Sequence, residues 1–315
     1  MSRLIYLDNA ATTKTAPEVV DAMIPYFTEH YGNPSSVYSF ASGNKEVVSR
    51  QREIIAQALG AQANEIYFTA GGSESDNWAL KATAEAYEKK GKHIITTKIE
   101  HHAILHTCEY LEKQRGFEIT YLDVDENGVV KLDELKKAIR PDTILISVMF
   151  ANNEIGTIQP IREIGEIAHE HGILFHTDAV QAFGQVPINV DECHIDMLSA
   201  SGHKLNGPKG IGFLYIRKGV KIRSFVHGGA QERKRRAGTE NVPGIAGISL
   251  AAKTIYDNLD KKVEKMRMLK QHFIEGVEKI ENTTIHGLYD ETSAPHIISV
   301  GIAGIRSEVL LHALE

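Results

Sequence analysis

The sequence has few features that would place the protein in a membrane, on nucleic acid or among disulfide-stabilised domains. Only Cys108 and Cys193 are cysteines among the 315 residues, which excludes a disulfide framework and suits a reducing cytosol. No apolar run approaches the ~18 residues that a membrane span needs, and the N-terminus lacks the apolar segment of a signal peptide. The net charge of −6 gives no overall positive field for nucleic acid. We therefore expect a globular, cytoplasmic protein with no nucleic-acid or membrane contact.

Short, β-rich apolar runs alternate with longer runs of helical period. Strands are predicted at 65–70, 93–98, 117–124, 143–152, 172–179, 196–202, 210–217 and 296–302. Helices are predicted at 74–91, 103–116, 132–139 and 161–172, with two or more in 242–280 and one at 307–315. Glycine closes three of these helical runs, at the position typical of a helix C-cap. The alternation predicts an α/β fold, a mostly parallel sheet with helices on both faces, in which 210–217 is a candidate antiparallel strand.

The segment SGHKLNGPKGIG (201–212) places Lys204 at the end of a predicted buried strand. A lysine in a crowded, partly buried site has a depressed pKa, and only its neutral amine can form a Schiff base. Lys204 is therefore a candidate Schiff-base lysine. The alternative is that Lys204 and Lys209 are solvated loop lysines.

Two further strand ends carry candidate cofactor ligands. Gly72 and Ser73 stand between a strand and a helix, where free N–H groups and the helix dipole favour a phosphate; alternatively, Ser73 only caps the helix. Asp178 and Gln181 follow another strand, and Asp178 lies 26 residues before Lys204. Such a carboxylate can pair with a protonated ring nitrogen, or it can cap the next helix.

A histidine cluster follows the predicted strand at 93–98. His101 is a candidate for stacking on a cofactor ring or for proton transfer. His102 and His106 have the i, i+4 spacing of a zinc pair, but no nearby carboxylate or thiolate completes a ligand set. We therefore predict no metal site.

Two loops carry further polar candidates. Asn152, Asn153 and Glu154 follow a strand, where amides can bind a ring hydroxyl or a substrate carboxylate, or can serve a turn. The glycine-rich loop at 227–241 contains Arg236 and Thr239, which are candidates for binding an anionic ligand.

Taken together, these segments resemble the class V, NifS/IscS-like pyridoxal-phosphate enzymes, specifically the cysteine desulfurases. The matching pieces, in family order, are YLDNAATT (6–13), YGNPSS (31–36), GGSES (71–75), EHHA (100–103), NNEIG (152–156), HTDAVQ (176–181), SGHKLNGPKGIG (201–212) and RAGTEN (236–241). The resemblance implies fold type I with a mostly parallel seven-stranded sheet. It also implies pyridoxal 5'-phosphate as cofactor, L-cysteine as substrate, a homodimer, and a sulfur-acceptor scaffold protein for iron–sulfur cluster assembly.

The same resemblance implies a role for each matching residue. Lys204 would carry the cofactor and move protons at the substrate α-carbon, and His101 would stack on the ring and share in catalysis. Asp178 would pair with the ring nitrogen, while Gln181 and Asn153 would reach the ring hydroxyl. The residues that would hold the phosphate are Gly72, Ser73, Ser201 and His203, with Thr239 completing the phosphate site of the partner subunit. Where this chain has Gly72 and Ser73, the family usually has Ala-Thr, which keeps the hydroxyl.

In one respect the chain departs from the family pattern. The family's nucleophilic cysteine follows the segment that matches LLHALE, whereas this sequence stops at Glu315. We therefore expect a truncated chain with a large domain at 14–250 and an incomplete α+β C-terminal domain formed by 1–13 and 251–315. Weak or absent desulfurase turnover is expected. The alternatives are another class V activity, such as an aminotransferase or selenocysteine lyase, and a non-catalytic remnant.

Overall fold

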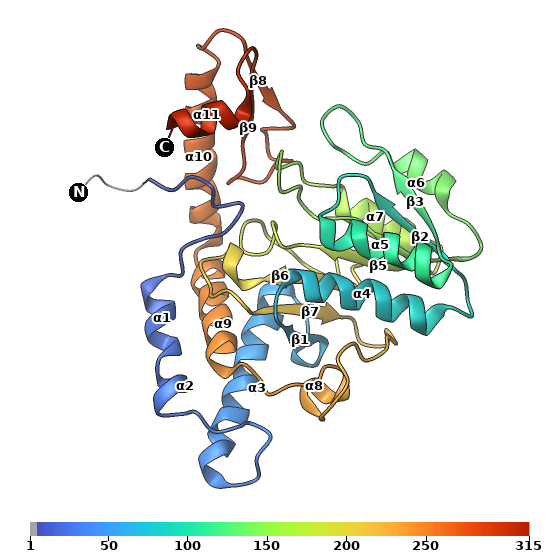
Figure 1. Ribbon diagram of the computed structural model, residues 1–315, viewed down its shortest axis with the longest axis vertical. Helices are drawn as coiled ribbons and strands as arrows, with labels where there is room; N and C mark the ends of the chain where they lie inside the picture. The colour runs from blue at the N-terminus through green and yellow to red at the C-terminus, as the bar shows by residue number, and fades with distance from the viewer. Residues whose placement is uncertain (1–4, 315) are drawn as a thin grey trace.

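The computed structural model describes residues 5–314, and strands and helices alternate along most of its length (Figure 1). The strands are β1 (Ile66–Thr69), β2 (His93–Thr97), β3 (Glu118–Leu122), β4 (Thr143–Ser147), β5 (Leu174–Asp178), β6 (Met197–Ser201), β7 (Gly212–Ile216), β8 (Thr283–His286) and β9 (Ser299–Ile302). The helices are α1 (Pro17–Met23), α2 (Pro25–Thr28), α3 (Ser39–Leu59), α4 (Gly72–Tyr87), α5 (His102–Arg115), α6 (Leu132–Ala138), α7 (Ile161–Glu170), α8 (Gln231–Lys234), α9 (Val242–Tyr256), α10 (Leu259–Val277) and α11 (Ser307–Leu314). Two short 3-10 turns are η1 (Ala63–Glu65) and η2 (Gly202–Lys204).

Strands β1 to β7 form one sheet in the order β1-β7-β6-β5-β4-β2-β3. Strand β7 runs antiparallel to β1 and β6, and the other neighbours pair in parallel. The register places Asp178 opposite Ser199, and Ser201 opposite Gly212. Parallel strands end on the same edge of a sheet, so the loops after β4, β5 and β6 share one crevice. The predicted mostly parallel, seven-stranded fold is confirmed.

Helices cover both faces of this sheet and create two separate cores. Helices α4 and α5 pack on one face in a core around Trp78, whereas α3, α7 and α9 pack on the other. Side chains alternate between the two cores along β1, where Ile66 and Phe68 belong to one core and Tyr67 between them belongs to the other, and along β7. This period of two is what a strand buried on both faces requires.

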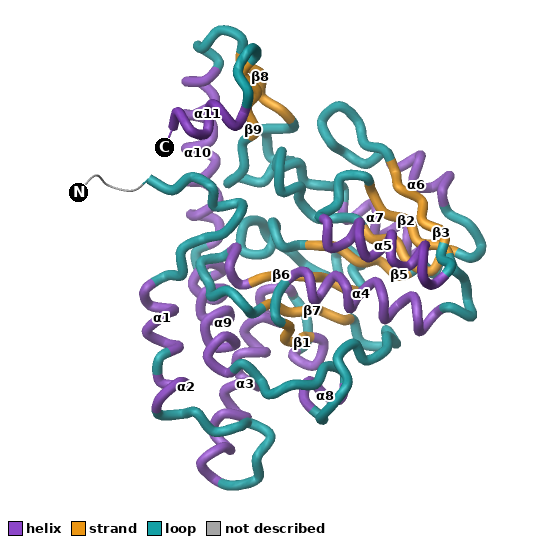
Figure 2. Tube along the Cα trace, viewed as in Figure 1, coloured by secondary structure: helices purple, strands orange, loops and turns teal. Residues whose placement is uncertain are grey.

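The C-terminal part lies beside the sheet rather than within it. Figure 2 shows the long helix α10 next to the β8–β9 ribbon and α11. Strands β8 and β9 pair antiparallel. The predicted domain boundary at residue 250 falls within α9, and the division into two domains stays a prediction, of which residues 1–4 and 315 lie outside the described part.

Most predicted elements coincide with observed ones, and the differences have local causes. Helices α1 and α3 and strand β8 were not predicted. Gly116 and Gly172 close α5 and α7 with left-handed backbone angles, as expected for C-caps. Gly91 does not close α4, which ends at Tyr87; instead it lets the backbone pass Asp142, whose carbonyl oxygen lies 2.0 Å from where a Cβ would be.

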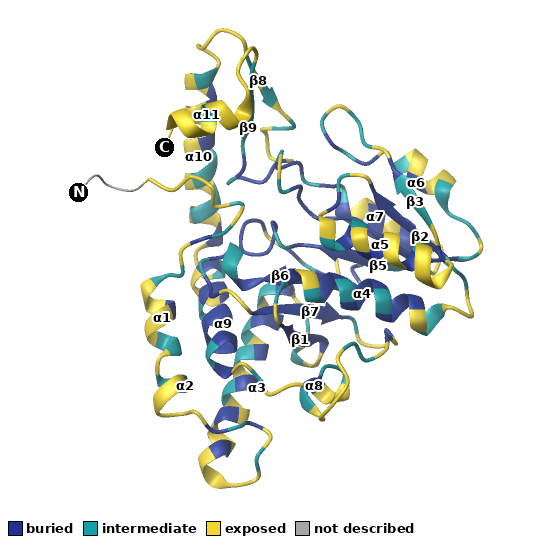
Figure 3. Ribbon diagram, in the orientation of Figure 1, coloured by how far each residue is buried: buried dark blue, intermediate teal, exposed yellow. Residues whose placement is uncertain are grey.

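Burial is strongest in the sheet and in the helices that pack against it (Figure 3). Helices α1, α2 and α11 are largely exposed in the same view. Within residues 5–314, no helix is both long enough and apolar enough to cross a lipid bilayer.

Candidate active site

A cavity of about 440 Å³ opens at the carboxyl edge of the sheet. Its walls come from the ends of β5 and β6, the loop after β4, the N-terminus of α4, and the N-terminal segment. The predicted site residues that line it are Gly72, Ser73, His101, Asn153, Asp178, Gln181, Ser201, His203 and Lys204. Residues that are separated by more than one hundred positions therefore meet in one place.

Lys204 ends the 3-10 turn η2, directly after β6. Its ammonium donates hydrogen bonds to the carbonyl oxygens of Ala10 and of Ala11, the latter at 2.9 Å. Burial lowers the pKa of Lys204, while the nearby carboxylates of Asp178 and Asp8 raise it. Because burial has the larger effect, the neutral, nucleophilic amine is more accessible than in a solvated lysine.

The N-terminal segment covers this lysine, which sequence reasoning did not foresee. Thr13 donates from its N–H and its hydroxyl to the carbonyl of His203, at 2.9 and 2.8 Å. The N–H of Asn206 donates to the Thr13 hydroxyl at 2.8 Å. The available signal was the motif YLDNAATT, which had no assigned role; its position on Lys204 follows from these long-range hydrogen bonds.

Asp178, the last residue of β5, is 6% exposed and accepts a hydrogen bond from the N–H of Val180 at 2.9 Å. Burial raises its pKa, whereas that hydrogen bond and electrostatic interactions with His101 and Lys204 lower it. The carboxylate turns back on its own backbone and caps no helix of the described chain.

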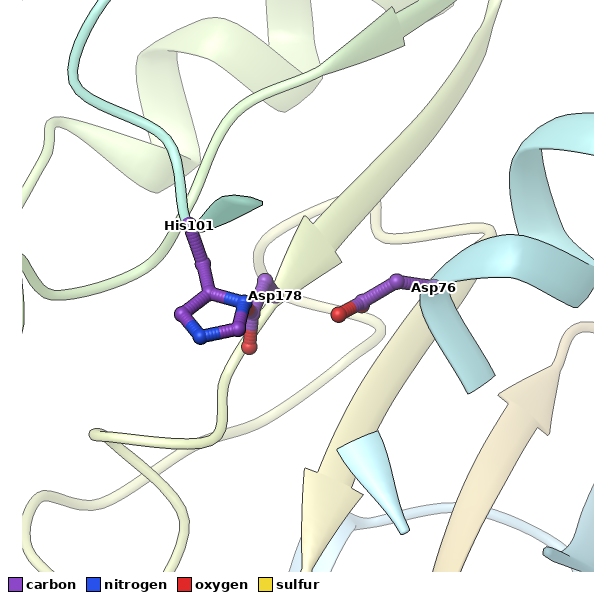
Figure 4. A group of neighbouring side chains, drawn as sticks. All are labelled: Asp76, His101 and Asp178. Carbon is purple, nitrogen blue, oxygen red and sulfur yellow. The ribbon is translucent and has the colours of Figure 1, made fainter. Parts of the chain in front are cut away.

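Asp76 brings a second buried carboxyl to the same point. Figure 4 shows Asp76, His101 and Asp178 converging. One carboxylate oxygen of each aspartate and one ring nitrogen of His101 lie within 4.8 Å of one another. Asp76 Oδ1 has no hydrogen-bond partner, and burial, followed by the charge of Asp178, raises the pKa of Asp76 well above its ordinary value. Sequence reasoning missed Asp76; the signal was its position one helical turn after Gly72, on the same helix face.

The N-terminus of α4 forms a cradle without side chains. Gly71 precedes the helix with φ +153°, and a Cβ on Gly72 would lie 2.6 Å from Val180 Cγ2. The first N–H groups of a helix have no intrahelical partner, so this turn presents free donors. Ser73 lies within the helix and makes no capping bond there, so the capping alternative is not observed. Ser201 and His203 complete the wall, with His203 Nδ1 3.1 Å from the Thr12 hydroxyl.

His101 is the N-cap of α5, and its Nδ1 accepts a hydrogen bond from the N–H of Ala103 at 3.1 Å. This bond requires an unprotonated Nδ1, so a neutral ring carries its proton on Nε2. His102 and His106 stack on each other at 5.1 Å on the exposed side of α5 and do not line the cavity. Only the first histidine of the cluster therefore faces the cavity.

Two amides on the rim have different environments. Asn152 is a turn residue, because its Oδ1 accepts the N–H groups of Glu154 at 2.9 Å and of Ile155 at 3.0 Å. Asn153 lines the cavity and donates to the Glu154 carboxylate at 2.6 Å. Asn152 therefore serves the turn, whereas Asn153 lines the cavity and can contact a ligand.

Thr239 is the one predicted site residue outside the cavity. It is exposed on the loop between α8 and α9. Arg236 on the same loop makes a two-bond pair with Glu74 of α4, at 2.7 and 3.0 Å. The pair ties this loop to the N-terminus of α4 and leaves Thr239 facing outward.

Neither cysteine belongs to the cavity. Cys108 is fully buried within α5, and burial raises the pKa of its thiol. Cys193 is half-buried, and burial raises its pKa as well. Both thiols are therefore poor nucleophiles and lie away from Lys204.

Comparison with known proteins points to one group. The family model Aminotransferase class-V matches residues 5–315. The chain is 59% identical over 314 residues to cysteine desulfurase IscS of Methanosarcina thermophila, covering 100% of this chain and 77% of that protein. It is 52% identical over 317 residues to cysteine desulfurase IscS of Clostridium botulinum, covering 100% and 80%. A solved NifS-like protein superposes with a TM-score of 0.96 at 41% identity, covering 99% of this chain and 85% of that one.

Proposed function

Because this chain belongs to the aminotransferase class-V family, we propose that it is a pyridoxal 5'-phosphate-dependent cysteine desulfurase. The reaction converts L-cysteine to L-alanine and passes the sulfur to a thiol as a persulfide. The observation that carries this proposal is the Lys204 amine, which two backbone carbonyls hold in a cavity that also contains the buried Asp178 carboxylate.

The cavity fits this cofactor at both ends. At one end, Gly72 and Ser73 at the start of α4 line the cavity, and the free N–H groups of this helix start suit a phosphate. At the other end, the buried Asp178 and the unpartnered Asp76 Oδ1 offer acceptors to a protonated ring nitrogen. A pyridinium N–H is a positively charged donor, so it would hydrogen-bond to the buried Asp178 carboxylate and offset the cost of burying it.

The role proposed for each cavity residue follows from its chemistry. Bound pyridoxal phosphate withdraws electrons from the substrate α-carbon, which makes the proton there acidic. Lys204 would hold the cofactor covalently, and its Nζ would take and return the proton at the α-carbon, which burial favours by lowering its pKa. Asp178 would keep the proton on the ring nitrogen. His101, oriented by the Ala103 N–H, would stack on the ring and present its Nε2–H to the substrate.

Sulfur transfer needs an acceptor thiol. The acceptor thiolate would attack the sulfur of cysteine and form the S–S bond of a persulfide. The Cβ–S bond would break, its electron pair would stay with Cβ, and Cβ would take up a proton to give alanine. Cys108 and Cys193 lie outside the cavity, so we assign neither as that acceptor. We propose that the sulfur serves iron–sulfur cluster assembly through a scaffold protein.

A homodimer and a cytoplasmic location are further parts of the proposal. Apolar side chains are exposed on and after α2, among them Phe27, Val37 and Phe40. Burying them against a second copy would remove apolar surface from water. The outward-facing Thr239 would then be available to the phosphate of the partner's cofactor. The low cysteine content supports the location.

A direct test is cofactor uptake followed by borohydride reduction. Incubation with pyridoxal 5'-phosphate should produce a visible absorbance band, and reduction should fix the cofactor on Lys204, which peptide mass mapping reads. The Lys204→Ala variant should bind cofactor weakly and give no adduct. A wild-type protein that takes up no cofactor would refute the proposal, and an adduct on Lys209 would refute the assignment.

The substrate is tested separately. With excess dithiol, which accepts the sulfur as a persulfide and then releases it as sulfide while becoming a disulfide, alanine and sulfide should form from L-cysteine at a low rate. A faster reaction with selenocysteine would favour a lyase, transfer of the amino group to a keto acid would favour an aminotransferase, and a loaded but inert protein would favour a remnant.

A further inference from the structure

Lys262 of helix α10 contacts the loop that follows β5. The Lys262 ammonium donates to the backbone carbonyl of Gly184 at 2.8 Å and to Gln185 Oε1 at 3.1 Å. Burial lowers the pKa of Lys262 to about 8. Both acceptors lie on the loop after β5, which also carries Asp178 and Gln181.

The amide nitrogen of Gln185 makes a hydrogen bond to the backbone of Lys204. Gln185 is 5% exposed, and its Nε2 donates to the backbone carbonyl of Lys204 at 3.1 Å. An amide has one end that accepts and one that donates. An ammonium can only donate, so Lys262 selects the orientation in which Oε1 faces α10 and Nε2 faces Lys204.

A second amide shows the same arrangement. Gln181 Oε1 lies 3.2 Å from Nε2 of His296, a residue that precedes β9. Its Nε2 donates at 2.8 Å to the Ala10 carbonyl, which also receives the Lys204 ammonium. Two buried glutamines thus connect the C-terminal part to Lys204. Gln185 binds the backbone carbonyl of Lys204, and Gln181 binds the Ala10 carbonyl that accepts the Lys204 ammonium.

We propose that Lys262 is a positioning residue for Lys204 and acts by orienting the Gln185 amide. The inference rests on the proposed function, in which Lys204 is the reactive amine. A lysine side chain has four rotatable bonds, so its amine is placed precisely only when the backbone that carries it is held as well as the amine itself. Catalytic geometry is sensitive to displacements of about 1 Å.

The chain offers a matched control on the same helix. Lys270 of α10 also donates two hydrogen bonds to neutral oxygens, the Ser293 hydroxyl at 2.8 Å and the Ala294 carbonyl at 3.0 Å. Burial lowers its pKa to about 8, as for Lys262. Its partners do not contact Lys204, so Lys270→Met should reproduce the loss of stability without the effect on the site.

The experiment measures the reactivity of Lys204 itself in the full chain without cofactor. Limiting acetic anhydride labels neutral amines, and mass spectrometry compares the labelling rate of Lys204 in Lys262→Met, Gln185→Met and Lys270→Met. If Lys204 loosens into water, the burial that lowers its pKa is lost and its neutral, reactive fraction falls. We expect labelling to slow several-fold in the first two variants, to stay close to wild type in the third, and to recover in Lys262→Arg.

Each other outcome overturns the inference. Wild-type labelling in Lys262→Met, or equal slowing in Lys270→Met, removes the special role of Lys262. Slow labelling in Lys262→Met but not in Gln185→Met would mean that charge acts without the amide. Failure of the wild-type protein to take up pyridoxal 5'-phosphate would instead refute the proposed function, and the labelling rates are read independently of that result.

Discussion

The buried carboxyl of Glu100, next to His101, gives a pH dependence of stability that can be worked out from the structure. The side chain is 5% exposed, and its Oε1 accepts hydrogen bonds from the Thr97 hydroxyl at 2.8 Å and from the N–H of Met149 at 2.9 Å. Its Oε2 has no partner. Burial raises the pKa of Glu100 from its ordinary value of 4.5 to about 8.

The sign of the effect follows from proton binding. Between pH 4.5 and 8 the folded state keeps the Glu100 proton that the unfolded chain has lost, so the contribution of this group to stability falls as pH rises. At about 1.4 kcal/mol for each pH unit, the full loss is about 5 kcal/mol. With an unfolding entropy of about 2.1 cal/mol/K per residue, that corresponds to about 7 °C in Tm. Partial water entry would reduce both numbers, so they are upper limits.

The variant Glu100→Gln keeps the shape and the two accepted hydrogen bonds but cannot ionise. Its Tm should rise relative to wild type as the pH increases from 5 to 9, by up to about 6 °C. At pH 5 the variant should equal wild type or lie slightly below it, because its amide N–H₂ has no acceptor. The assay is thermal unfolding followed by circular dichroism across this pH range.

A surface carboxyl provides the control. Glu109 pairs with Lys113 on α5, and that hydrogen bond lowers its pKa, so it is ionised throughout the range. Glu109→Gln should therefore change Tm by the same small amount at every pH. If the curves of wild type and Glu100→Gln were also parallel between pH 5 and 9, the argument that Glu100 is folded in its protonated form would be wrong.

Two further sets of substitutions test packing and a buried ion pair. A Cβ on Gly72 would lie 2.6 Å from Val180 Cγ2, so Gly72→Ala should cost about 1–3 kcal/mol in urea unfolding. Gly43→Ala on α3 meets nothing within 4 Å and should instead add about 0.5–1 kcal/mol to stability, so a loss there would contradict the packing argument. The pair between Arg52 and Glu232 joins atoms at 2.7 and 2.8 Å, with side chains 11% and 4% exposed. Arg52→Met should cost about 3–5 kcal/mol in urea unfolding, and adding Glu232→Leu should recover most of it; an additive loss would refute the unpaired-charge explanation.

Local sequence patterns were sufficient for much of the sheet. The seven runs from 65–70 to 210–217 became β1 to β7, because each contrasts with the helical periods around it and all but the edge strand β3 are almost wholly buried. The antiparallel course of 210–217 followed from the short turn after Lys204. Strand β8 was missed because it is a half-exposed edge pair with mixed polar residues.

The chemical identity of the candidate site was also readable in the sequence, because strand-end motifs carry the side chains that a cofactor needs. What the sequence could not determine is which backbone atoms and which unremarkable residues surround them. The Ala10 and Ala11 carbonyls, the Asp76 carboxyl and the Gln185 amide come from three distant segments.

Burial explains this division. The propensity of a segment to form a strand or a helix depends on residues that are neighbours in the chain, so it can be predicted from the sequence. The pKa of Lys204, the protonation of Glu100 and the orientation of Gln185 depend on desolvation and on partners brought from elsewhere, and only the tertiary structure decides them.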